Sequence, residues 1–130
     1  MESKNIKILL VDDEADFRQL MTFWLKSKGY SVMTATDGKS AIDMVKEEPP
    51  DIIFLDLRMP VMDGVEVLKR IRKFNKDVPV IVISAYINDP GAKDLASYSI
   101  SGVFYKGENF EQALPLLETA LRTHKKLKKT

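Results

Sequence analysis

The sequence contains no cysteine and only one histidine among its 130 residues. Without thiols there are no disulfides and no thiolate zinc sites, and one histidine cannot form a multi-histidine metal cage. Any bound metal must therefore be held by oxygen. The sequence also lacks an apolar run near the roughly 20 residues that span a bilayer, and residues 1–7 lack the pattern of a secretory leader. We therefore expect a cytoplasmic protein without membrane contact.

The size and charge of the chain indicate one ordinary domain. Hydrophobic residues make up 45% and charged residues 30%, a mixture typical of globular proteins. We expect a domain over residues 1–124 and a basic tail or linker stub over residues 125–130, where the lysines gather. Such a run usually solvates a helix end, and contact with nucleic acid or with an anionic surface is the less favoured alternative. Direct DNA binding is not expected, because no DNA-reading element has room here.

Short apolar runs rich in branched residues alternate with longer segments of helical period, which predicts βαβ units around a parallel sheet. The five runs are residues 6–11, 30–35, 51–55, 79–83 and 102–105. The first, third and fourth are almost wholly apolar, as expected for strands covered by helices on both faces. Right-handed crossovers then give an open, doubly wound α/β sheet. Functional groups in such sheets lie beyond the carboxyl ends of the strands.

The remaining segments predict five helices of unequal clarity. Asp37 and Asp63 are candidate N-caps of the second and third helices, and Gly29 is a candidate end of the first. The first and third helices have apolar stripes, formed by Phe17, Leu20, Met21, Trp24 and Leu25, and by Val67, Leu68, Ile71 and Phe74. Residues 89–98 show little apolar periodicity and predict a short or mobile fourth helix. Pro115 requires the last helix to start late or to kink.

Polar side chains follow four of the strands at the point where each ends. Asp12 and Asp13 follow the first run, Asp56 the third, Ser84 the fourth and Lys106 the fifth. If the first and third strands are neighbours, three carboxylates converge, and their repulsion is tolerable only with a cation or with raised pKa values. Mg²⁺ accepts such oxygen ligands together with waters. A carboxylate can also be the nucleophile in phosphoryl transfer, with a hydroxyl and an ammonium group as donors to the transferred group.

Each of these residues alone has a simpler explanation. An aspartate at a strand end is most often a turn former or a helix cap, a serine can bond to the backbone, and a lysine can be a solvated edge charge. Their joint placement at successive strand ends is not explained in this way. It favours a functional site.

Four motifs run through most of the chain: ILLVDDE at 8–14, DIIFLDLRMPVMDG at 51–64, PVIVISA at 79–85, and Lys106. In combination they resemble the receiver domains of bacterial two-component response regulators. The resemblance implies a flavodoxin-like fold, with strand order 2-1-3-4-5 and five helices in a three-layer α/β/α sandwich. It also implies a signalling switch that catalyses only its own phosphorylation and dephosphorylation, rather than an enzyme acting on outside substrates.

The resemblance assigns roles to the residues at the strand ends. Asp56 would accept a phosphoryl group from a sensor histidine kinase or a histidine phosphotransfer protein, while Ser84 and Lys106 would hold the phosphoryl oxygens. The implied ligands of Mg²⁺, with Mn²⁺ as an alternative, are the carboxylates of Asp13 and Asp56, the backbone carbonyl of Arg58, and Asp12 through a bound water. Helix four, strand five and helix five would form the face that binds an unknown downstream protein, and a homodimer is a further option.

Three positions depart from the family pattern. Gly107 replaces the proline after the lysine, Val103 replaces the rotating aromatic, and Ser99-Ile100 replaces a small pair before the last strand. A non-proline cis bond costs about 2.5–4 kcal/mol, so we expect a trans bond after Lys106 or a looser loop. These departures leave open a degenerate receiver that acts as a phosphorylation-independent binding or dimerisation module. A metal-dependent phosphatase is least favoured, because no substrate pocket or further general acid is evident.

Arg58 and Tyr86 lie beside the site, at positions that in the family affect how water reaches the acyl phosphate. Bulky side chains there would lengthen its lifetime. Two exposed residues without a kinetic role are an equally favoured alternative.

Overall fold

The computed structural model describes residues 6–86 and 89–123, without the side chains of residues 92 and 93. The tail predicted over residues 125–130 lies outside the described residues. None of the helices within these ranges is long and apolar enough to cross a membrane.

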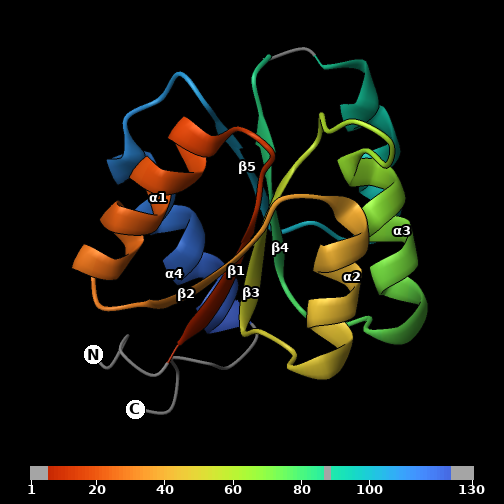
Figure 1. Cartoon of the computed structure of the whole chain (residues 1–130), viewed down its shortest axis with the longest axis horizontal. Coiled ribbons are helices and arrows are strands. Elements are labelled where there is room, and N and C mark those ends of the chain that lie inside the picture. The colour runs from red at the N-terminus through yellow and green to blue at the C-terminus, as the bar shows by residue number, and fades with distance from the viewer. Residues whose placement is uncertain (1–5, 87–88, 124–130) are drawn as a thin grey trace.

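A parallel five-stranded sheet forms the centre of the molecule (Figure 1). Its strands are β1 (Lys7–Val11), β2 (Ser31–Ala35), β3 (Ile52–Asp56), β4 (Val80–Ser84) and β5 (Gly102–Tyr105). They lie in the order β2-β1-β3-β4-β5, and every pair is parallel. The predicted strand order is confirmed, and each strand boundary falls within one residue of its predicted position. All five strands end at one edge of the sheet, as parallel strands must.

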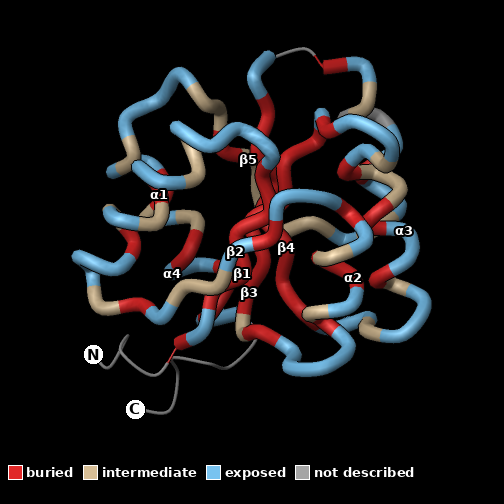
Figure 2. The backbone as a smooth tube through the Cα atoms, in the orientation of Figure 1, coloured by how far each residue is buried: buried red, intermediate tan, exposed pale blue. Residues whose placement is uncertain are grey.

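Helices cover both faces of this sheet. Helices α1 (Ala15–Ser27) and α4 (Ala113–Thr123) lie on one face, and α2 (Gly38–Glu47) and α3 (Gly64–Phe74) lie on the other. Each face has its own apolar core, and β3 and β4 are buried along their whole length (Figure 2). This double burial explains why these strands read as continuous apolar runs.

Two of the predicted caps hold the helices that begin near the strand ends. The Asp37 carboxylate accepts a hydrogen bond from the backbone N–H of Ser40 at 2.8 Å, and that of Asp63 accepts from Glu66 at 3.0 Å. A side-chain cap of this kind stabilises a helix by about 1 kcal/mol. Both caps satisfy N–H groups that have no partner within the helix.

The helix content differs from the prediction in one place. Four α-helices lie within the described residues rather than five, because the predicted fourth helix is a 3-10 helix, η2 (Pro90–Tyr98). Little apolar periodicity is present there to hold an α-helix against the sheet. A short 3-10 turn, η3 (Phe110–Gln112), precedes α4, which begins at Ala113. Pro115 therefore lies in the first turn, and the late start predicted for this helix is confirmed.

The predicted apolar stripes are only partly buried. Met21 and Leu25 are fully buried on α1, but Leu20 is 61% exposed. On α3, Val67, Leu68 and Ile71 are buried, whereas Phe74 is 42% exposed. Leu20 and Phe74 belong to the predicted apolar stripes but lie outside the part of each stripe that is buried.

Candidate functional site

The sheet brings the predicted site residues together at its carboxyl edge. Val11 pairs with Leu55, so Asp12 follows β1 directly beside Asp56, the last residue of β3. Ser84 ends β4 and pairs with Tyr105, and Lys106 comes immediately after β5. Residues far apart in the sequence therefore share one small volume, as the sequence predicted.

Three carboxylates form the centre of this volume. One oxygen atom from each of Asp12, Asp13 and Asp56 lies within 4.8 Å of the others. Asp12 and Asp56 are buried, while Asp13 is exposed. The cluster therefore has two carboxylates removed from water and one that remains in contact with it.

Burial and crowding change the acidity of the two inner carboxyl groups. Burial raises the pKa of Asp56 to about 7, and the neighbouring charge of Asp12 adds to this effect. Burial also raises the pKa of Asp12 above its ordinary value. Two like charges held together away from water have this effect, because the charged form of each group is disfavoured.

Lys106 is the cation that faces this cluster. Its ammonium Nζ lies 3.2 Å from Asp12 Oδ2 and 3.4 Å from Asp56 Oδ2, and it also contacts the carboxylate of Glu14. Burial alone would lower the pKa of Lys106, but the three acidic neighbours raise it overall. The lysine therefore stays charged, with its side chain only 17% exposed.

The donor set of the cluster fits a hard divalent cation. The ligand atoms are all carboxylate oxygens, and the buried Oδ2 of Asp12, although 3.2 Å from the Lys106 ammonium, accepts no hydrogen bond of regular geometry from the described residues. One ammonium group cannot balance three carboxylates, and oxygen ligands of this kind are those that Mg²⁺ prefers. The backbone N–H of Arg58 donates to Asp56 Oδ1 at 3.1 Å, which fixes the loop beyond Asp56.

Gly64 explains how α3 approaches the end of β3. A Cβ atom at this position would lie 2.3 Å from the backbone oxygen of Asp56, so any side chain would collide with the strand. The backbone N–H of Gly64 donates to the Leu57 carbonyl at 2.8 Å, which closes the loop. The motif that contains Met62, Asp63 and Gly64 therefore sets the backbone on which Asp56 sits.

The Ser84 hydroxyl lies at the predicted strand end but does not contact the acidic cluster. It donates to the backbone carbonyl of Tyr86 at 2.7 Å and accepts from the Tyr86 N–H at 3.2 Å. The side chain is buried within its own loop. Ser84 would therefore have to release Tyr86 before it could bond to a group on Asp56.

The loop after Lys106 is ordered without a proline. No cis peptide bond occurs within the described residues, so the bond from Lys106 to Gly107 is trans, as predicted. The N–H of Lys106 donates to the Ser84 carbonyl, and the N–H of Glu108 donates to the Tyr105 carbonyl, each at 2.9 Å. These backbone bonds hold the turn that carries the lysine.

An ion pair that the sequence analysis missed joins Arg58 to Asp89. The Arg58 guanidinium donates from Nε and Nη2 to the two carboxylate oxygens of Asp89, at 3.1 and 2.7 Å. The Asp89 side chain is 1% exposed, and it also accepts from the N–H of Gly91 at the start of η2. The Arg58 contact keeps the pKa of Asp89 below its ordinary value. The sequence had placed Asp89 only at the start of the predicted fourth helix, where it caps η2.

Removing the Arg58 side chain is expected to destabilise the fold. Arg58→Ala leaves the Asp89 carboxylate buried without its charged partner, so the free energy of unfolding at pH 7 should fall by about 1–2 kcal/mol. Because the pKa of Asp89 is lowered in the folded state, this contribution is present above its ordinary pKa and is lost as the pH falls through the folded value. Urea unfolding at pH 7 and in acid measures both effects.

Arg70→Ala is the matched control for this variant. Arg70 is as exposed as Arg58, at 53% against 56%, but its partner Glu66 is 39% exposed rather than buried. Its loss should cost no more than about 0.5 kcal/mol. Equal losses in the two variants would contradict a special role for the buried carboxylate.

Comparisons with known proteins agree with the fold. Residues 8–118 match the response regulator receiver domain. The chain is 40% identical to Sporulation initiation phosphotransferase F of Bacillus subtilis over 82 residues, which are 63% of this chain and 66% of that protein. It is 44% identical to the probable transcriptional regulator ycf27 of Guillardia theta over 85 residues, 65% of this chain and 33% of that protein. The alignments thus cover less than two thirds of these curated relatives.

Solved structures give the same result over nearly the whole chain. The response regulator TrrA of Thermotoga maritima, solved in complex with Mg²⁺-BeF, is 33% identical, with a TM-score of 0.81 over 89% of this chain and 99% of that one. The match therefore covers the fold of most of this chain. The chain belongs to the family of response regulator receiver domains, the receiving modules of two-component signalling systems.

Proposed function

We propose that Asp56 accepts a phosphoryl group and that the phosphorylated domain changes its binding to a partner. The observation that carries this proposal is the convergence of Asp12, Asp13 and Lys106 on the buried carboxylate of Asp56. Even with Lys106 beside it, the Asp56 carboxyl has a pKa of about 7, so it would be half protonated at neutral pH and a poor nucleophile. A bound divalent cation would favour its ionised form.

The residues that would hold Mg²⁺, with Mn²⁺ as an alternative, are the carboxylates of Asp12, Asp13 and Asp56 and the backbone carbonyl of Arg58. Waters would complete the six oxygen ligands, and Asp12 would act mostly through one of them. When bound, the metal ion neutralises charge on the carboxylates and on the transferred phosphoryl oxygens. The exposed position of Asp13 keeps this side of the cluster open to a phosphodonor.

The transfer itself exchanges one bond for another. A carboxylate oxygen of Asp56 forms a bond to phosphorus while the bond from phosphorus to the donor imidazole nitrogen breaks, and that nitrogen keeps the electron pair and binds a proton. The Lys106 ammonium, already 3.4 Å from Asp56 Oδ2, would then bind a phosphoryl oxygen. The product is an aspartyl phosphate on Asp56.

Ser84 links this chemistry to a conformational change. Its hydroxyl is bonded to the Tyr86 carbonyl, so binding a phosphoryl oxygen requires it to break that bond. The backbone of Tyr86, which Ser84 now holds, would shift as a result. This route does not need the aromatic residue that Val103 replaces.

A sensor histidine kinase or a histidine phosphotransfer protein would supply the phosphoryl group. The face formed by η2, β5 and α4 would bind the downstream partner, which could also be a second copy of the chain. We place this activity in the cytoplasm and expect no direct DNA binding. The chain would catalyse only its own phosphorylation and dephosphorylation.

A phosphorylation-independent binding module is the second candidate. The departures at Val103 and Gly107 favour it, because they remove two features that the family uses in switching. The presence of Asp12, Asp13, Asp56, Ser84 and Lys106 opposes it. The loop around Lys106 is held by backbone bonds without the proline, so the Gly107 departure is the weaker of the two.

Intact mass after incubation with acetyl phosphate tests the proposed function. With Mg²⁺ the protein is expected to gain one phosphoryl group, located by peptide mapping to the segment that contains Asp56, and with EDTA it should gain none. Acetyl phosphate replaces the unknown kinase, so only the domain's own residues are tested. No gain in a folded protein shown to bind Mg²⁺ would favour the phosphorylation-independent module instead.

A further inference from the structure

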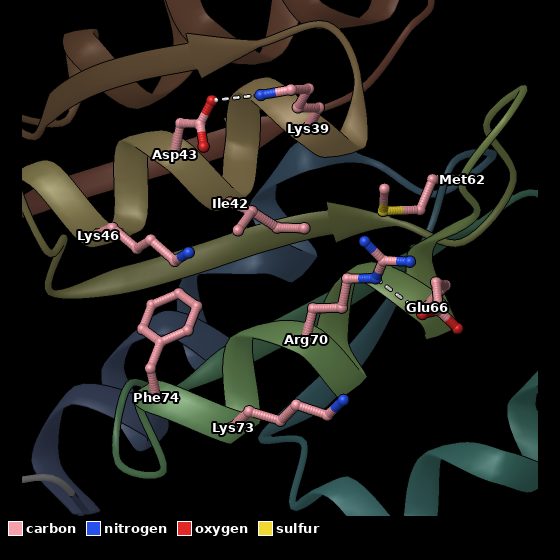
Figure 3. Close-up of a pocket in the computed structure, with 9 residues that line it drawn as sticks. All are labelled: Lys39, Ile42, Asp43, Lys46, Met62, Glu66, Arg70, Lys73 and Phe74. Atoms are coloured by element: carbon pink, nitrogen blue, oxygen red, sulfur yellow. Dashed lines mark hydrogen bonds and ion pairs between the residues drawn. The ribbon is translucent and has the colours of Figure 1, made fainter.

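A groove runs between α2 and α3, on the face of the sheet opposite α1 and α4 (Figure 3). Its volume is about 530 Å³, and none of the carboxylates at the strand ends lines it. The lining residues of α2 are spaced three and four apart along one face of the helix, and so are those of α3. The groove is therefore a surface separate from the phosphoryl-transfer site.

The floor of the groove is apolar. Ile42 from α2, Met62 from the loop before α3 and Phe74 from the end of α3 contribute to it. Phe74 is 42% exposed, although Ile71, one turn earlier on α3, is buried. A large apolar side chain left open between two helices indicates a surface that gains stability when it is covered.

The rim of the groove is basic. Four of its side chains are cationic and two are acidic. Asp43 pairs with Lys39 at 3.1 Å, and Glu66 pairs with Arg70 at 2.8 Å, each within one helix. Each acidic side chain is thus paired with a basic side chain of its own helix, so the charge left along the rim is positive.

The positive charge that remains lies at the Phe74 end. Lys46 lies over the Phe74 ring, with its Nζ 5.3 Å from the ring centroid, and Lys73 is one residue before Phe74. Neither lysine forms a salt bridge to an acidic side chain among the residues that the structure describes. An apolar floor with unpaired ammonium groups along one side is complementary to a ligand that is apolar on one face and acidic on the other.

We propose that the groove between α2 and α3 docks an acidic amphipathic helix of a protein partner. Apolar side chains of that helix would cover Ile42, Met62 and Phe74, and its carboxylates would pair with Lys46 and Lys73. Seven residues of helix span about 10 Å, which matches the two turns over which the lining residues of α2 extend. This docking goes beyond phosphoryl transfer and does not rest on it.

Nucleic acid and small anions fit the groove less well. The phosphates of a nucleic acid would leave the apolar floor uncovered, and no buried donor converges on one point as a small anion requires. An anionic membrane is flat and could not reach an apolar floor that lies between two helices. A helix, in contrast, can lie along the groove and contact both its apolar floor and its basic rim.

A labelled peptide of about 14 residues tests the proposal, with leucines at helical spacing on one face and glutamates elsewhere. Fluorescence anisotropy is expected to show saturable binding to the wild-type protein. A scrambled peptide of the same composition should bind at least about tenfold more weakly, because it has the charge without the apolar stripe. Lys46→Glu and Lys73→Glu should each weaken binding about tenfold, since each replaces an attraction by a repulsion.

Lys26→Glu is the matched control, because it makes the same charge change at an exposed position on α1, on the other face of the sheet. It should leave the affinity within about twofold of wild type at constant ionic strength. Circular dichroism confirms that each variant is folded. Equal binding of the two peptides, an equal loss in Lys26→Glu, or displacement of the peptide by pyrophosphate with no effect of Phe74→Ala would each overturn the proposal. Asp56→Asn should bind the peptide as wild type does, which separates docking from phosphorylation.

Discussion

Asparagine in place of Asp56 is expected to abolish phosphorylation and to stabilise the fold at the same time. The amide has no anionic oxygen to attack phosphorus, so intact mass should show no gain with acetyl phosphate and Mg²⁺. The substitution also removes a carboxylate that burial and Asp12 disfavour, as its pKa of about 7 indicates. We expect the free energy of unfolding in EDTA at pH 8 to rise by on the order of 2 kcal/mol.

The direction of this stability change depends on pH. A carboxyl group whose pKa is raised from 3.8 to about 7 on folding favours the folded state fully below pH 3.8, and this contribution is lost as the pH rises through 7. The free energy of unfolding of Asp56→Asn should therefore exceed that of wild type at pH 8 and approach it near pH 4. Asp13→Asn is the matched control, because it makes the same change at an exposed member of the cluster. An Asp56→Asn protein that is no more stable than wild type at pH 8 would contradict the raised pKa.

The chain order of apolar runs was enough to predict the sheet. Strands buried on both faces consist almost entirely of apolar residues, and this is true of β3 and β4. Parallel topology then places the carboxyl ends together, so Asp12, Asp56 and Lys106 could be grouped before any coordinates were known. These residues are predictable because a single topological rule positions all of them.

Contacts that depend on where a side chain points could not be predicted from the order of the strands. Arg58 and Asp89 are separated by 31 positions, and no periodic pattern relates them. The Ser84 hydroxyl was expected to face the cluster, but it bonds to Tyr86, because a serine beside a free carbonyl in its own loop has a competing local partner.

The exposure of apolar residues was the other feature that the sequence could not predict. Periodicity shows that Phe74 shares a face with Val67 and Ile71, but it does not show how far the neighbouring helix covers that face. Phe74, the last residue of α3, is left 42% exposed beside Lys46. It therefore forms part of the apolar floor of the groove proposed as a docking surface.

Replacing Lys106 with glutamine is expected to separate two roles of the cluster. The ammonium group lies 3.4 Å from Asp56 Oδ2, where it would bind the transferred phosphoryl oxygen, so its loss should slow phosphorylation by about 10²–10³-fold. The same charge repels a metal ion bound to Asp12 and Asp56. Its removal should therefore tighten Mg²⁺ binding, by about fivefold, once the carboxyl groups are ionised.

The pH of the Mg²⁺ titration decides how its result is interpreted. Lys106 lowers the pKa of Asp56, so the glutamine variant holds its proton to higher pH, and Mg²⁺ must then displace it. Titrations at about pH 8.5 or above reduce this competition. Lys26→Gln, at an exposed position on α1, controls for the loss of one positive charge. Opposite changes in rate and Mg²⁺ affinity would identify Lys106 as a donor to the phosphoryl group. A parallel fall in both would mean that the lysine serves mainly to hold the carboxylates in place for the metal.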